Sequence, residues 1–492
     1  MRPELERFRE TLHEHARMRP SSLALRGETE RYDYAALLAE VERRERMLRQ
    51  EPAGVFALGL ENGPQAVLWD LAALLAERPC LILPPFFSPA QRAHCLEQSR
   101  ANLLMAGPEL ADELKAAGYQ PDGGFWRKPV ELDDGLPSGT AKITYTSGTT
   151  GQPKGVCLSA EALLRVAREL ENVSRPAQPQ QYLAVLPLAV LLENLGLYAA
   201  LIAGATLTLL PQRQVGIQGA SGVDWQRFLG TLVLSGAQSM ILVPQLLLGL
   251  VTALERGLLR TDQFRFVAVG GARVSPALLA RAAKLELPVF EGYGLSECAS
   301  VVCLNRTTAN RPGSVGQPLP HVRVKLANDG EVLVNGSHLL GYLGETPFTG
   351  EWWPTGDIGE FDADGYLYLK GRKKYQFITS YGRNVNPDWV EAELTQRGVI
   401  AQAFVHGEGL PGNLALLLPL DPTCDDDTLA QAVSRANAQL PDYARVHAWH
   451  RLSEPFTPAN GLLTANGRPR REAILARYRD TLFELETSEV AP

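Results

Sequence analysis

A glycine-rich segment contains the first residues that could bind an anion. It joins two short β-prone runs, 143–146 and 156–159, and holds three glycines, one proline, several hydroxyl side chains and Lys154. Glycines let backbone N–H groups approach a phosphate closely, hydroxyls add short donors, and the lysine adds a mobile positive charge. The commoner phosphate loop opens a helix with Gly-Lys-Ser/Thr, whereas here the lysine precedes a glycine and a strand. The spacing therefore predicts a hairpin-like flap over a triphosphate; composition alone would also fit an ordinary polar turn.

The full string Thr-Ser-Gly-Thr-Thr-Gly-Gln-Pro-Lys-Gly, which starts at Thr146, resembles the signature loop of the acyl-adenylate-forming superfamily. That superfamily contains acyl-CoA synthetases, adenylation domains of peptide synthetases and luciferases. The resemblance implies that the loop holds the β- and γ-phosphates of ATP. The residues expected to do so are Thr146, Ser147, Gly148, Thr149, Thr150 and Lys154.

Two later segments resemble nucleotide motifs of the same superfamily. Gly270-Gly271-Ala272 resembles its adenine-side turn, although a plain strand-to-helix turn would have the same composition. The string Glu-Gly-Tyr-Gly-Leu-Ser-Glu at 291–297 resembles the pattern Tyr-Gly-x-Thr/Ser-Glu. The resemblance implies that Tyr293 stacks on adenine, that Ser296 contacts the α-phosphate and that Glu297 binds Mg²⁺, for which a carboxylate is a suitable ligand. The nucleotide-binding residues expected from both segments are Gly270, Gly271, Ala272, Glu291, Gly292 and Tyr293.

Ribose and hinge motifs follow in the superfamily's order. Thr355-Gly356-Asp357 resembles the ribose motif, in which one carboxylate accepts hydrogen bonds from both ribose hydroxyls. Arg372 matches the second ribose contact, and Lys374 matches the hinge about which the small domain rotates. The segment 382–391 resembles the loop that lines the approach of the thiol in thioester-forming members. Any one of these charged residues alone would fit a solvated surface position, but their common order argues against coincidence.

The last motif departs from the superfamily pattern. There a lysine, after Asn-Gly or in Thr-x-x-x-Lys, holds the carboxylate and the α-phosphate during adenylation. Here Arg468 follows Asn-Gly at 466–467. Arginine keeps the charge and can bind an oxyanion bidentately, but its planar fork is bulkier and differently aimed. We expect Arg468 to act in catalysis with Ser296, Glu297 and Lys374; the alternatives are a slow or altered first step, a substitute lysine, a solvated arginine or lost activity.

The substrate segment gives a weaker signal. Peptide-synthetase domains carry an aspartate here that pairs with the amino group of their substrate, but 186–193 reads Leu-Pro-Leu-Ala-Val-Leu-Leu-Glu, with Glu193 as its sole carboxylate. The string is more similar to Leu-Pro-Leu-Ala-His-x-x-Glu of long-chain fatty acyl-CoA synthetases, with Val190 in place of histidine. The resemblance therefore implies a fatty or other apolar acid rather than an α-amino acid.

Alternating apolar runs predict the elements that must position these residues. Between 54 and 107, three strands alternate with helices at 64–77 and 89–98, the second capped by Ser88. Such alternation predicts right-handed βαβ units and a mostly parallel sheet. Short buried strands between 182 and 290 predict a second α/β layer.

The sequence pattern changes after Gly313. Short β-prone runs separated by Gly, Asn and Asp predict a small distorted β-barrel there. A compact α/β module follows, with a helix that starts at Pro387 and is capped by Asn386. The predicted fold class is α/β. A large N-terminal adenylate-forming domain, 1–370, has two αβ layers plus the barrel, and a smaller mobile domain occupies 371–492.

Composition narrows the possible partners. The 492 residues carry a net charge of −7, which argues against nucleic acid as the principal partner because no basic excess is available. The six cysteines form no CxxC pair, and the charged N-terminal segment does not resemble a signal peptide, so a reducing, cytoplasmic location is expected. The apolar stretch 186–210 is interrupted by Glu193 and by glycines, which predicts a buried helix and strand rather than a membrane span.

Together these patterns predict an acid–thiol ligase that forms an acyl adenylate from a carboxylic acid and MgATP. Pyrophosphate is released, and CoA or a carrier-protein phosphopantetheine then accepts the acyl group; an acyl carrier protein is thus a possible partner. Two alternatives stay open at this point: transfer of the adenylate to an amine or internal hydroxyl, and a nucleotide-binding protein that has lost catalysis. The acid, the acceptor and the oligomeric state are not specified by the sequence.

Overall fold

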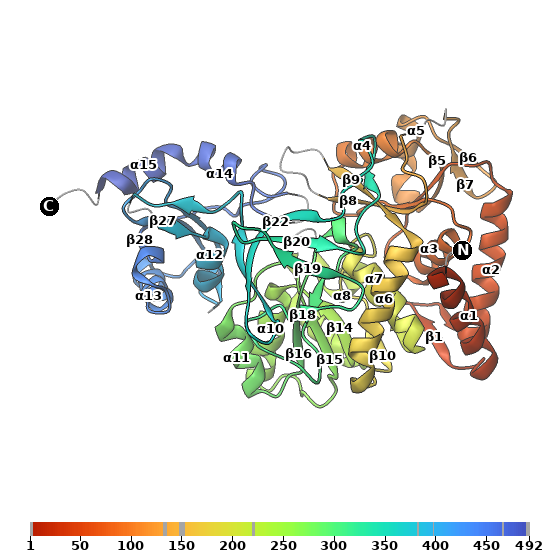
Figure 1. Cartoon of the computed structure of the whole chain (residues 1–492), viewed down its shortest axis with the longest axis horizontal. Coiled ribbons are helices and arrows are strands. Elements are labelled where there is room, and N and C mark those ends of the chain that lie inside the picture. Colours follow the sequence, from red (N-terminus) through yellow and green to blue (C-terminus); the bar gives the residue numbers. More distant parts are fainter. Residues whose placement is uncertain are drawn as a thin grey trace.

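The computed structural model describes residues 3–130, 135–146, 153–218, 222–380, 383–396, 398–464 and 467–488. Two large sheets with helices between and around them form most of the chain, and the C-terminal elements form a separate lobe at the opposite end from the N-terminus (Figure 1). Within the described residues, no helix is both long enough and apolar enough to cross a membrane.

The first large sheet carries the phosphate-loop hairpin. Its central strands are parallel and alternate with helices α3 (Pro64–Leu75) and α4 (Pro89–Ser99), as the sequence predicted. Ser88 caps α4 and accepts a hydrogen bond from the Gln91 N–H. In the described residues the strand order is β21 (Gly341–Tyr342), β9 (Lys154–Ser159), β8 (Thr140–Thr146), β4 (Cys80–Ile82), β3 (Val55–Gly59), β5 (Ala101–Ala106), β7 (Phe125–Arg127) and β6 (Gln120–Asp122).

The second large sheet is the predicted second layer. It is parallel through its centre, so the carboxyl ends of its strands share one edge. Gly270, which follows β15, and Glu291 of β16, which pairs with the last residue of β15, lie at that edge. The strand order in the described residues is β18 (Gln317–Pro318), β17 (Cys303–Leu304), β16 (Val289–Tyr293), β15 (Phe266–Val269), β14 (Ser239–Leu242), β10 (Gln181–Leu183), β11 (Thr206–Thr208), β1 (Leu23–Arg26) and β2 (Arg31–Asp33).

Helices α6 (Ala160–Ser174) and α7 (Leu191–Ala203) lie between the two sheets (Figure 1). Their apolar side chains join residues from both sheets in one core, which includes Val156 and Ile241. The other face of the second sheet is covered by α9 (Trp225–Ser235), α10 (Pro244–Glu255) and α11 (Pro276–Lys284), with a second core beneath them. The apolar stretch 186–210 is therefore a buried helix and strand, as predicted.

A buried polar cluster fixes the hairpin strand β8 to the helices beside it. The Lys142 ammonium donates to Asp70 of α3, to Asn194 and to the Tyr198 hydroxyl of α7, the last two at 3.0 and 3.1 Å. Asp70 also accepts hydrogen bonds from Asn194 at 2.8 Å and from Tyr198 at 2.7 Å. All four side chains are buried, so each polar atom of the cluster needs its partner.

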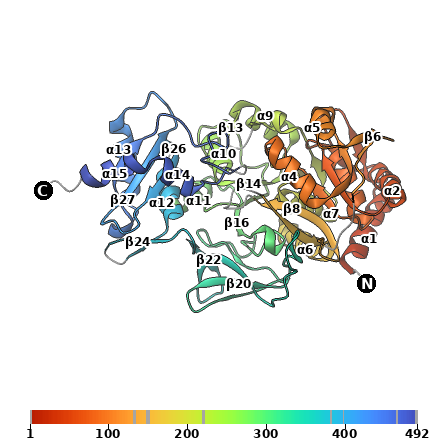
Figure 2. The ribbon, with the colours of Figure 1, turned by 90° about the horizontal axis from the view of Figure 1, so that it is seen from above.

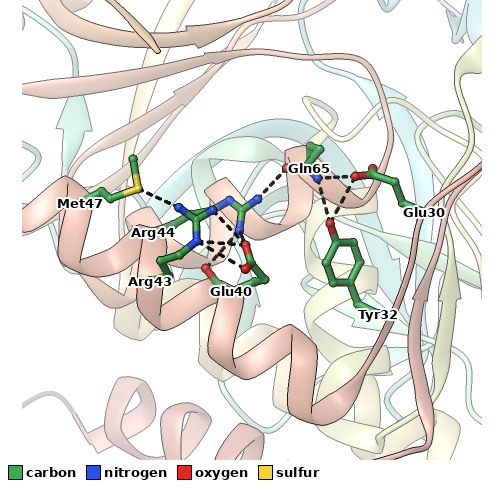
Figure 3. A network of polar contacts seen from close by, with 7 residues as sticks. All are labelled: Glu30, Tyr32, Glu40, Arg43, Arg44, Met47 and Gln65. Carbon is green, nitrogen blue, oxygen red and sulfur yellow. Dashed lines mark hydrogen bonds and ion pairs between the residues drawn. The ribbon is translucent and has the colours of Figure 1, made fainter. Parts of the chain in front are cut away.

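A second polar network joins α2 (Tyr34–Gln50) to the start of α3 (Figure 3). Gln65 accepts a hydrogen bond from Arg44 at 2.7 Å and donates to the Tyr32 hydroxyl at 3.0 Å. Arg44 also pairs with Glu40 one turn earlier on the same helix. These contacts hold the first turn of α3, which begins two residues after Asn62.

The region after 313 forms an antiparallel sheet in place of the predicted small barrel. Its order in the described residues is β19 (Arg323–Leu326), β20 (Glu331–Asn335), β22 (Trp353–Phe361) and β23 (Leu367–Arg372). Register shifts at Glu331–Leu333 and Ile358–Gly359 bend the strands. The two edge strands are not paired with each other in the described residues, so the sheet stays open and lies to one side of the large sheets (Figure 2).

The C-terminal lobe is built on a mixed sheet of β26 (Ile400–His406), β27 (Asn413–Pro419) and β28 (Val446–Arg451). Helices α12 (Pro387–Thr395) and α13 (Asp426–Asn437) pack on one face. As predicted, Asn386 caps α12 and Pro387 is its first residue. The last described segment forms two helices, α14 (Arg471–Arg477) and α15 (Arg479–Ser488), because the Tyr478 backbone between them leaves the helical region (φ −105, ψ 20).

The remaining elements are short or peripheral. The described part of the chain also contains α1 (Pro3–Met18), α5 (Ala111–Ala116), α8 (Gln212–Val215), β12 (Ile217–Gln218), β13 (Gly222–Val223), β24 (Phe377–Ile378) and β25 (Asn384–Val385).

Candidate active site

One cavity of about 2300 Å³ brings together the motifs that the sequence analysis singled out. The phosphate-loop hairpin, the carboxyl ends of β15 and β16, the β22–β23 pair and the last loop of the C-terminal lobe all contribute to its wall. The expected site residues that line it are Thr146, Lys154, Gly270, Gly271, Ala272, Glu291, Gly292, Tyr293, Ser296, Glu297, Asp357, Arg372, Lys374 and Arg468. Four other expected residues, Ser147, Gly148, Thr149 and Thr150, lie outside the described residues.

The hairpin predicted around the phosphate loop is present. Strands β8 and β9 pair antiparallel, with Thr146 opposite Lys154 where the hairpin enters and leaves the loop. The Lys154 ammonium lies 3.0 Å from the Glu345 carboxylate and 5.0 Å from the centre of the Tyr342 ring. Both Lys154 and Glu345 are exposed, so this ion pair is easily exchanged for a phosphate.

Tyr342 connects the phosphate loop to the expected Mg²⁺ ligand. It lies on β21, opposite Val156 of β9, and its hydroxyl donates to Glu297 at 2.9 Å. Sequence reasoning missed this tyrosine, because a single Tyr after a glycine carries no chemical signal. In the described residues, no three His, Cys, Asp or Glu side chains form a metal-binding group. A single carboxylate such as Glu297 fits Mg²⁺, which takes one or two carboxylates together with substrate phosphates.

Asp357 and Arg372 face each other across the β22–β23 pair. Their atoms Oδ1 and Nε are 2.8 Å apart, and the Tyr293 hydroxyl donates to the other carboxylate oxygen at 2.7 Å. Burial raises the pKa of Asp357, and the charges of Arg372 and Arg468 counteract that rise. The expected ribose residues therefore form one hydrogen-bonded group with the expected adenine residue, Tyr293.

Glu291 is a buried acid in the middle of β16. Its side chain lines the cavity, and Oε2 has no hydrogen-bond partner among the described residues. Burial raises the pKa of Glu291 to about 8, while the Val274 N–H and the charge of Arg273 counteract the rise. At neutral pH the group is therefore a neutral carboxyl that can donate one hydrogen bond into the cavity.

Arg468 reaches the nucleotide residues from the C-terminal lobe. Two hydrogen bonds join its backbone to Thr464: the Thr464 N–H donates to the Arg468 carbonyl at 2.8 Å, and the Arg468 N–H donates to the Thr464 hydroxyl at 3.1 Å. Part of its side chain is exposed in the cavity. The protein atoms around the guanidinium nevertheless displace much of its water. This desolvation and the charge of Arg372 lower its pKa, while Glu297 and Asp357 act in the opposite direction. Among the described residues, Arg468 has no ion-pair partner and is available for an anion.

Direct contacts hold the C-terminal lobe beside the second large sheet. The Ser275 hydroxyl, at the start of α11, donates to the Gln396 side chain just after α12. Arg273 donates to the Leu369 carbonyl at 3.2 Å, and its guanidinium lies 5.8 Å from the centre of the Trp389 ring on α12. Lys374, at the expected hinge, pairs with Glu472 at 3.4 Å with both side chains exposed.

Arg471 and Glu391 form a buried pair next to the cavity. The guanidinium contacts Glu391 at 2.5 Å and Asp388 at 3.2 Å, so it ties α14 to α12. Burial raises the pKa of Glu391 to about 7 although Arg471 opposes the rise. The pair holds the last residues of the 382–391 segment, which is expected to line the approach of the thiol.

The substrate segment after β10 is held by two buried side chains. Asn62 donates to the Leu186 carbonyl and accepts from the Leu188 N–H, both at 2.8 Å. Glu193 accepts from the Tyr182 hydroxyl and from the Leu186 N–H, so both of its oxygens are occupied. Burial raises its pKa to about 8. Glu193 therefore orders the segment and is not free to pair with a substrate amino group.

Family models match nearly the whole chain. Residues 12–345 match the model described as AMP-binding enzyme, and residues 374–488 match the model described as AMP-binding enzyme C-terminal domain. Between them these matches contain every expected site residue except Asp357 and Arg372.

Curated relatives are carboxylate–CoA ligases with different acids. The chain is 26% identical over 463 residues to the long-chain-fatty-acid–CoA ligase FadD15 of Mycobacterium bovis, with 78% of this chain and 75% of the relative covered. It is 29% identical over 411 residues to the 2-succinylbenzoate–CoA ligase of Enterococcus faecalis, with 77% of this chain and 79% of the relative covered.

Solved structures share the fold over almost the full length. The anthranilate CoA ligase AuaEII in complex with anthranoyl-AMP has a TM-score of 0.79 at 19% identity, with 96% of both chains covered. The o-succinylbenzoate CoA synthetase of Bacillus subtilis, in complex with ATP and magnesium ion, has a TM-score of 0.75 at 23% identity, covering 94% of this chain and 98% of that one. The amide bond synthetase McbA of Marinactinospora thermotolerans has a TM-score of 0.75 at 22% identity, covering 97% and 100%. The α/β architecture, the cavity with its ordered motifs and the two family matches lead to one conclusion: the chain belongs to the AMP-binding enzyme family.

Proposed function

We propose that this AMP-binding enzyme is an acid–thiol ligase for an apolar carboxylic acid. It converts the acid and MgATP to an acyl adenylate and pyrophosphate, and then transfers the acyl group to a thiol. The observation that carries the proposal is the position of Arg468, which shares one cavity with Lys154, Glu297 and Asp357. The guanidinium of Arg468, which belongs to the C-terminal lobe, thus lies in the same cavity as side chains of the N-terminal domain that are suited to bind a nucleotide.

The charged residues of the cavity divide the work of the first step. Lys154 exchanges its Glu345 partner for the β- and γ-phosphates, and Asp357 with Arg372 holds the ribose hydroxyls. Glu297 is the residue that would hold Mg²⁺, whose charge offsets that of the phosphates when it is bound. Ser296 contacts the α-phosphate, and Gly270, Gly271, Ala272, Gly292 and Tyr293 enclose the adenine.

Arg468 acts where negative charge develops. When a carboxylate oxygen attacks the α-phosphorus, the O–P bond to pyrophosphate breaks and charge builds on the phosphate oxygens and on the leaving group. A guanidinium already placed in the cavity stabilises this charge without reorganisation. Because its fork can bind the carboxylate and a phosphate oxygen together, it also orients the two reacting groups.

The second step requires the C-terminal lobe to move. We place the domain boundary near residue 371 and the hinge at Lys374, whose single exposed ion pair with Glu472 gives little resistance to rotation. Rotation removes Arg468 from the cavity and presents the 382–391 segment, so that a thiol can attack the acyl carbon and release AMP. The acceptor is CoA or the phosphopantetheine of an acyl carrier protein, and the reaction takes place in the cytoplasm.

An amide-forming ligase is the second candidate, favoured by the structural similarity to the amide bond synthetase McbA. It shares the adenylation step and differs in the acceptor. Product analysis of one acid with CoA, with an amine and with neither distinguishes the two.

The decisive experiment measures pyrophosphate release from MgATP with a panel of carboxylic acids for wild type, Arg468→Ala and Arg468→Lys. We expect acid-dependent release in wild type and a loss of about 100-fold or more in the alanine variant, the size typical for removal of one transition-state donor. The lysine variant should retain part of the rate because the charge remains.

Arg477→Ala is the matched control. Arg477 lies in the same C-terminal segment but pairs with Glu454 at the surface, outside the cavity. Its rate should equal that of wild type. Failure of every acid to release pyrophosphate, with ATP binding intact, would reduce the protein to a nucleotide-binding protein; equal rates for wild type and Arg468→Ala would show that Arg468 has no part in adenylation.

A further inference from the structure

The expected ribose motif, residues 355–357, leaves the regular pairing between β20 and β22, which are neighbouring strands of the small sheet (Figure 2). Glu331 of β20 pairs with Ile358 of β22. Two residues further along β20, Leu333 pairs with Pro354, so residues 355–357 lie opposite a single residue of β20. Such a bulge interrupts the hydrogen-bond ladder, and its backbone groups then need other partners.

The Glu331 carboxylate is one of these partners. Its Oε1 accepts a hydrogen bond from the Gly356 N–H at 2.9 Å, and its Oε2 lies 3.0 Å from the Lys373 ammonium. The Lys373 N–H in turn donates to the Gly356 carbonyl at 2.8 Å. The Glu331 side chain is only 14% exposed, so little water competes for these bonds. Glu331 therefore holds the bulge directly at Gly356 and a second time through Lys373.

The direction of the Asp357 carboxylate depends on the backbone of Gly356, the residue before it. Gly356 has φ +72, and a glycine can leave this conformation for many others because it has no Cβ atom. Arg372 and Tyr293 contact the two oxygens of Asp357 at 2.8 and 2.7 Å. These contacts orient the carboxylate, whereas Glu331 holds the main chain that carries it.

We propose that Glu331 is a positioning residue for recognition of the ribose hydroxyls. Its carboxylate keeps the bulge in the one shape in which Asp357 faces the ribose. The inference rests on the proposed function and adds to it a residue that acts through Asp357. Both side chains line the cavity, but the two oxygens of Glu331 are already bonded to Gly356 and Lys373.

The quantity that reports this role is the preference for ATP over 2′-deoxy-ATP. The deoxy nucleotide lacks one of the hydroxyls that would donate to Asp357, so the wild type should bind ATP about tenfold or more tightly. A displaced Asp357 loses this preference, because neither nucleotide then finds the carboxylate in place. A general loss of stability or of phosphate binding would instead weaken both nucleotides equally and leave their ratio unchanged.

Glu331→Met and Glu331→Gln form a matched pair of variants. Both remove the charge and keep a side chain of similar size, but only glutamine has an oxygen that can accept from the Gly356 N–H. Dissociation constants for both nucleotides are measured by titration calorimetry with Mg²⁺, and kcat/KM is measured by pyrophosphate release. We expect Glu331→Met to bind ATP about tenfold more weakly and 2′-deoxy-ATP less than about threefold more weakly. Glu331→Gln should keep most of the wild-type preference.

Asp329→Asn is the control for the contact with Lys373. Asp329 lies 2.6 Å from the Lys373 ammonium but, among the described residues, makes no hydrogen bond with Gly356, so this variant should keep the wild-type preference. Glu331→Ala repeats the test should the methionine variant fail to fold.

The outcomes separate this inference from the proposed function. A preference for ATP that is as strong in Glu331→Met as in wild type would overturn the role of Glu331 while the proposed function stands. A wild type that binds both nucleotides equally well would overturn the ribose contact of Asp357 and the inference with it. Failure of every acid to release pyrophosphate would overturn the proposed function, and the binding ratio would still decide the role of Glu331.

Discussion

At the scale of single residues, the chemistry of the site depends on how far each charged group is removed from water. Arg468 stays charged although desolvation by the surrounding protein and the charge of Arg372 lower its pKa, since a guanidinium in a protein does not lose its proton near neutral pH. Glu291 behaves in the opposite way, because burial raises its pKa to about 8 and keeps it neutral at pH 7. The cavity therefore contains Arg468, which is always positively charged, and Glu291, which gains a negative charge as the pH rises through about 8.

Glu291 makes both stability and nucleotide binding depend on pH. Its folded pKa of about 8 lies above the ordinary value of 4.5, so the folded state binds more protons between these values and stability falls as pH rises through that range. Ionisation would also place a negative charge in the cavity that we propose to hold the nucleotide. We expect the KM for ATP to rise by about threefold or more above pH 8 in wild type and to change much less in Glu291→Gln. Initial rates at varied ATP from pH 6.5 to about 9 test this.

Glu193 and Glu391 also have raised pKa values, about 8 and about 7, and add to the fall in stability over the same range. Neither carboxyl is replaced in Glu291→Gln, so only the KM separates the role of Glu291 from theirs. If the KM for ATP changed with pH in the same way in wild type and in Glu291→Gln, the proposed role of Glu291 in this pH dependence would be wrong.

At the scale of elements, the phosphate-loop hairpin depends on the buried cluster beneath β8. Replacing Lys142 by methionine leaves Asp70 as a buried charge with only neutral donors, Asn194 and Tyr198. Breaking such a pair by removing one partner costs about 3–5 kcal/mol, whereas removing both charges costs less. We expect Lys142→Met to lower the first thermal unfolding midpoint strongly and Lys142→Met/Asp70→Leu to recover part of the loss.

Hydrogen exchange measures the local stability of strand β8 directly. Amides of 140–146 should exchange faster in the single variant, while those of α13 in the C-terminal lobe, which touches none of these residues, serve as the reference. A single variant as stable as wild type would mean that the cluster does not hold the hairpin strand.

At the scale of the whole molecule, the C-terminal lobe lies so that Arg468 lines the cavity, which is the arrangement that we propose for adenylation. The contact between Ser275 and Gln396 offers a place to fix that arrangement. In Ser275→Cys/Gln396→Cys, a short thiol-reactive cross-linker should leave pyrophosphate release on the first turnover intact but lower thioester formation by about 100-fold or more, since the second step needs the lobe to rotate. Gln396→Cys alone, treated in the same way, is the control; a cross-linked enzyme that forms thioester at the full rate would refute the rotation.

The sequence alone determined the order of motifs, the α/β class and the local elements, because these depend on neighbouring residues. Caps at Ser88 and Asn386 and the hairpin around the phosphate loop are local patterns of this kind.

Contacts between segments far apart in the chain were decided by the tertiary structure. In the described residues the edge strands β19 and β23 do not pair with each other, so the sheet is open where a barrel was expected. In the folded chain both carboxylate oxygens of Glu193 accept hydrogen bonds, and the Tyr342 hydroxyl donates to Glu297. Arg468 lines the same cavity as Asp357, because the fold brings the C-terminal lobe to the β22–β23 pair.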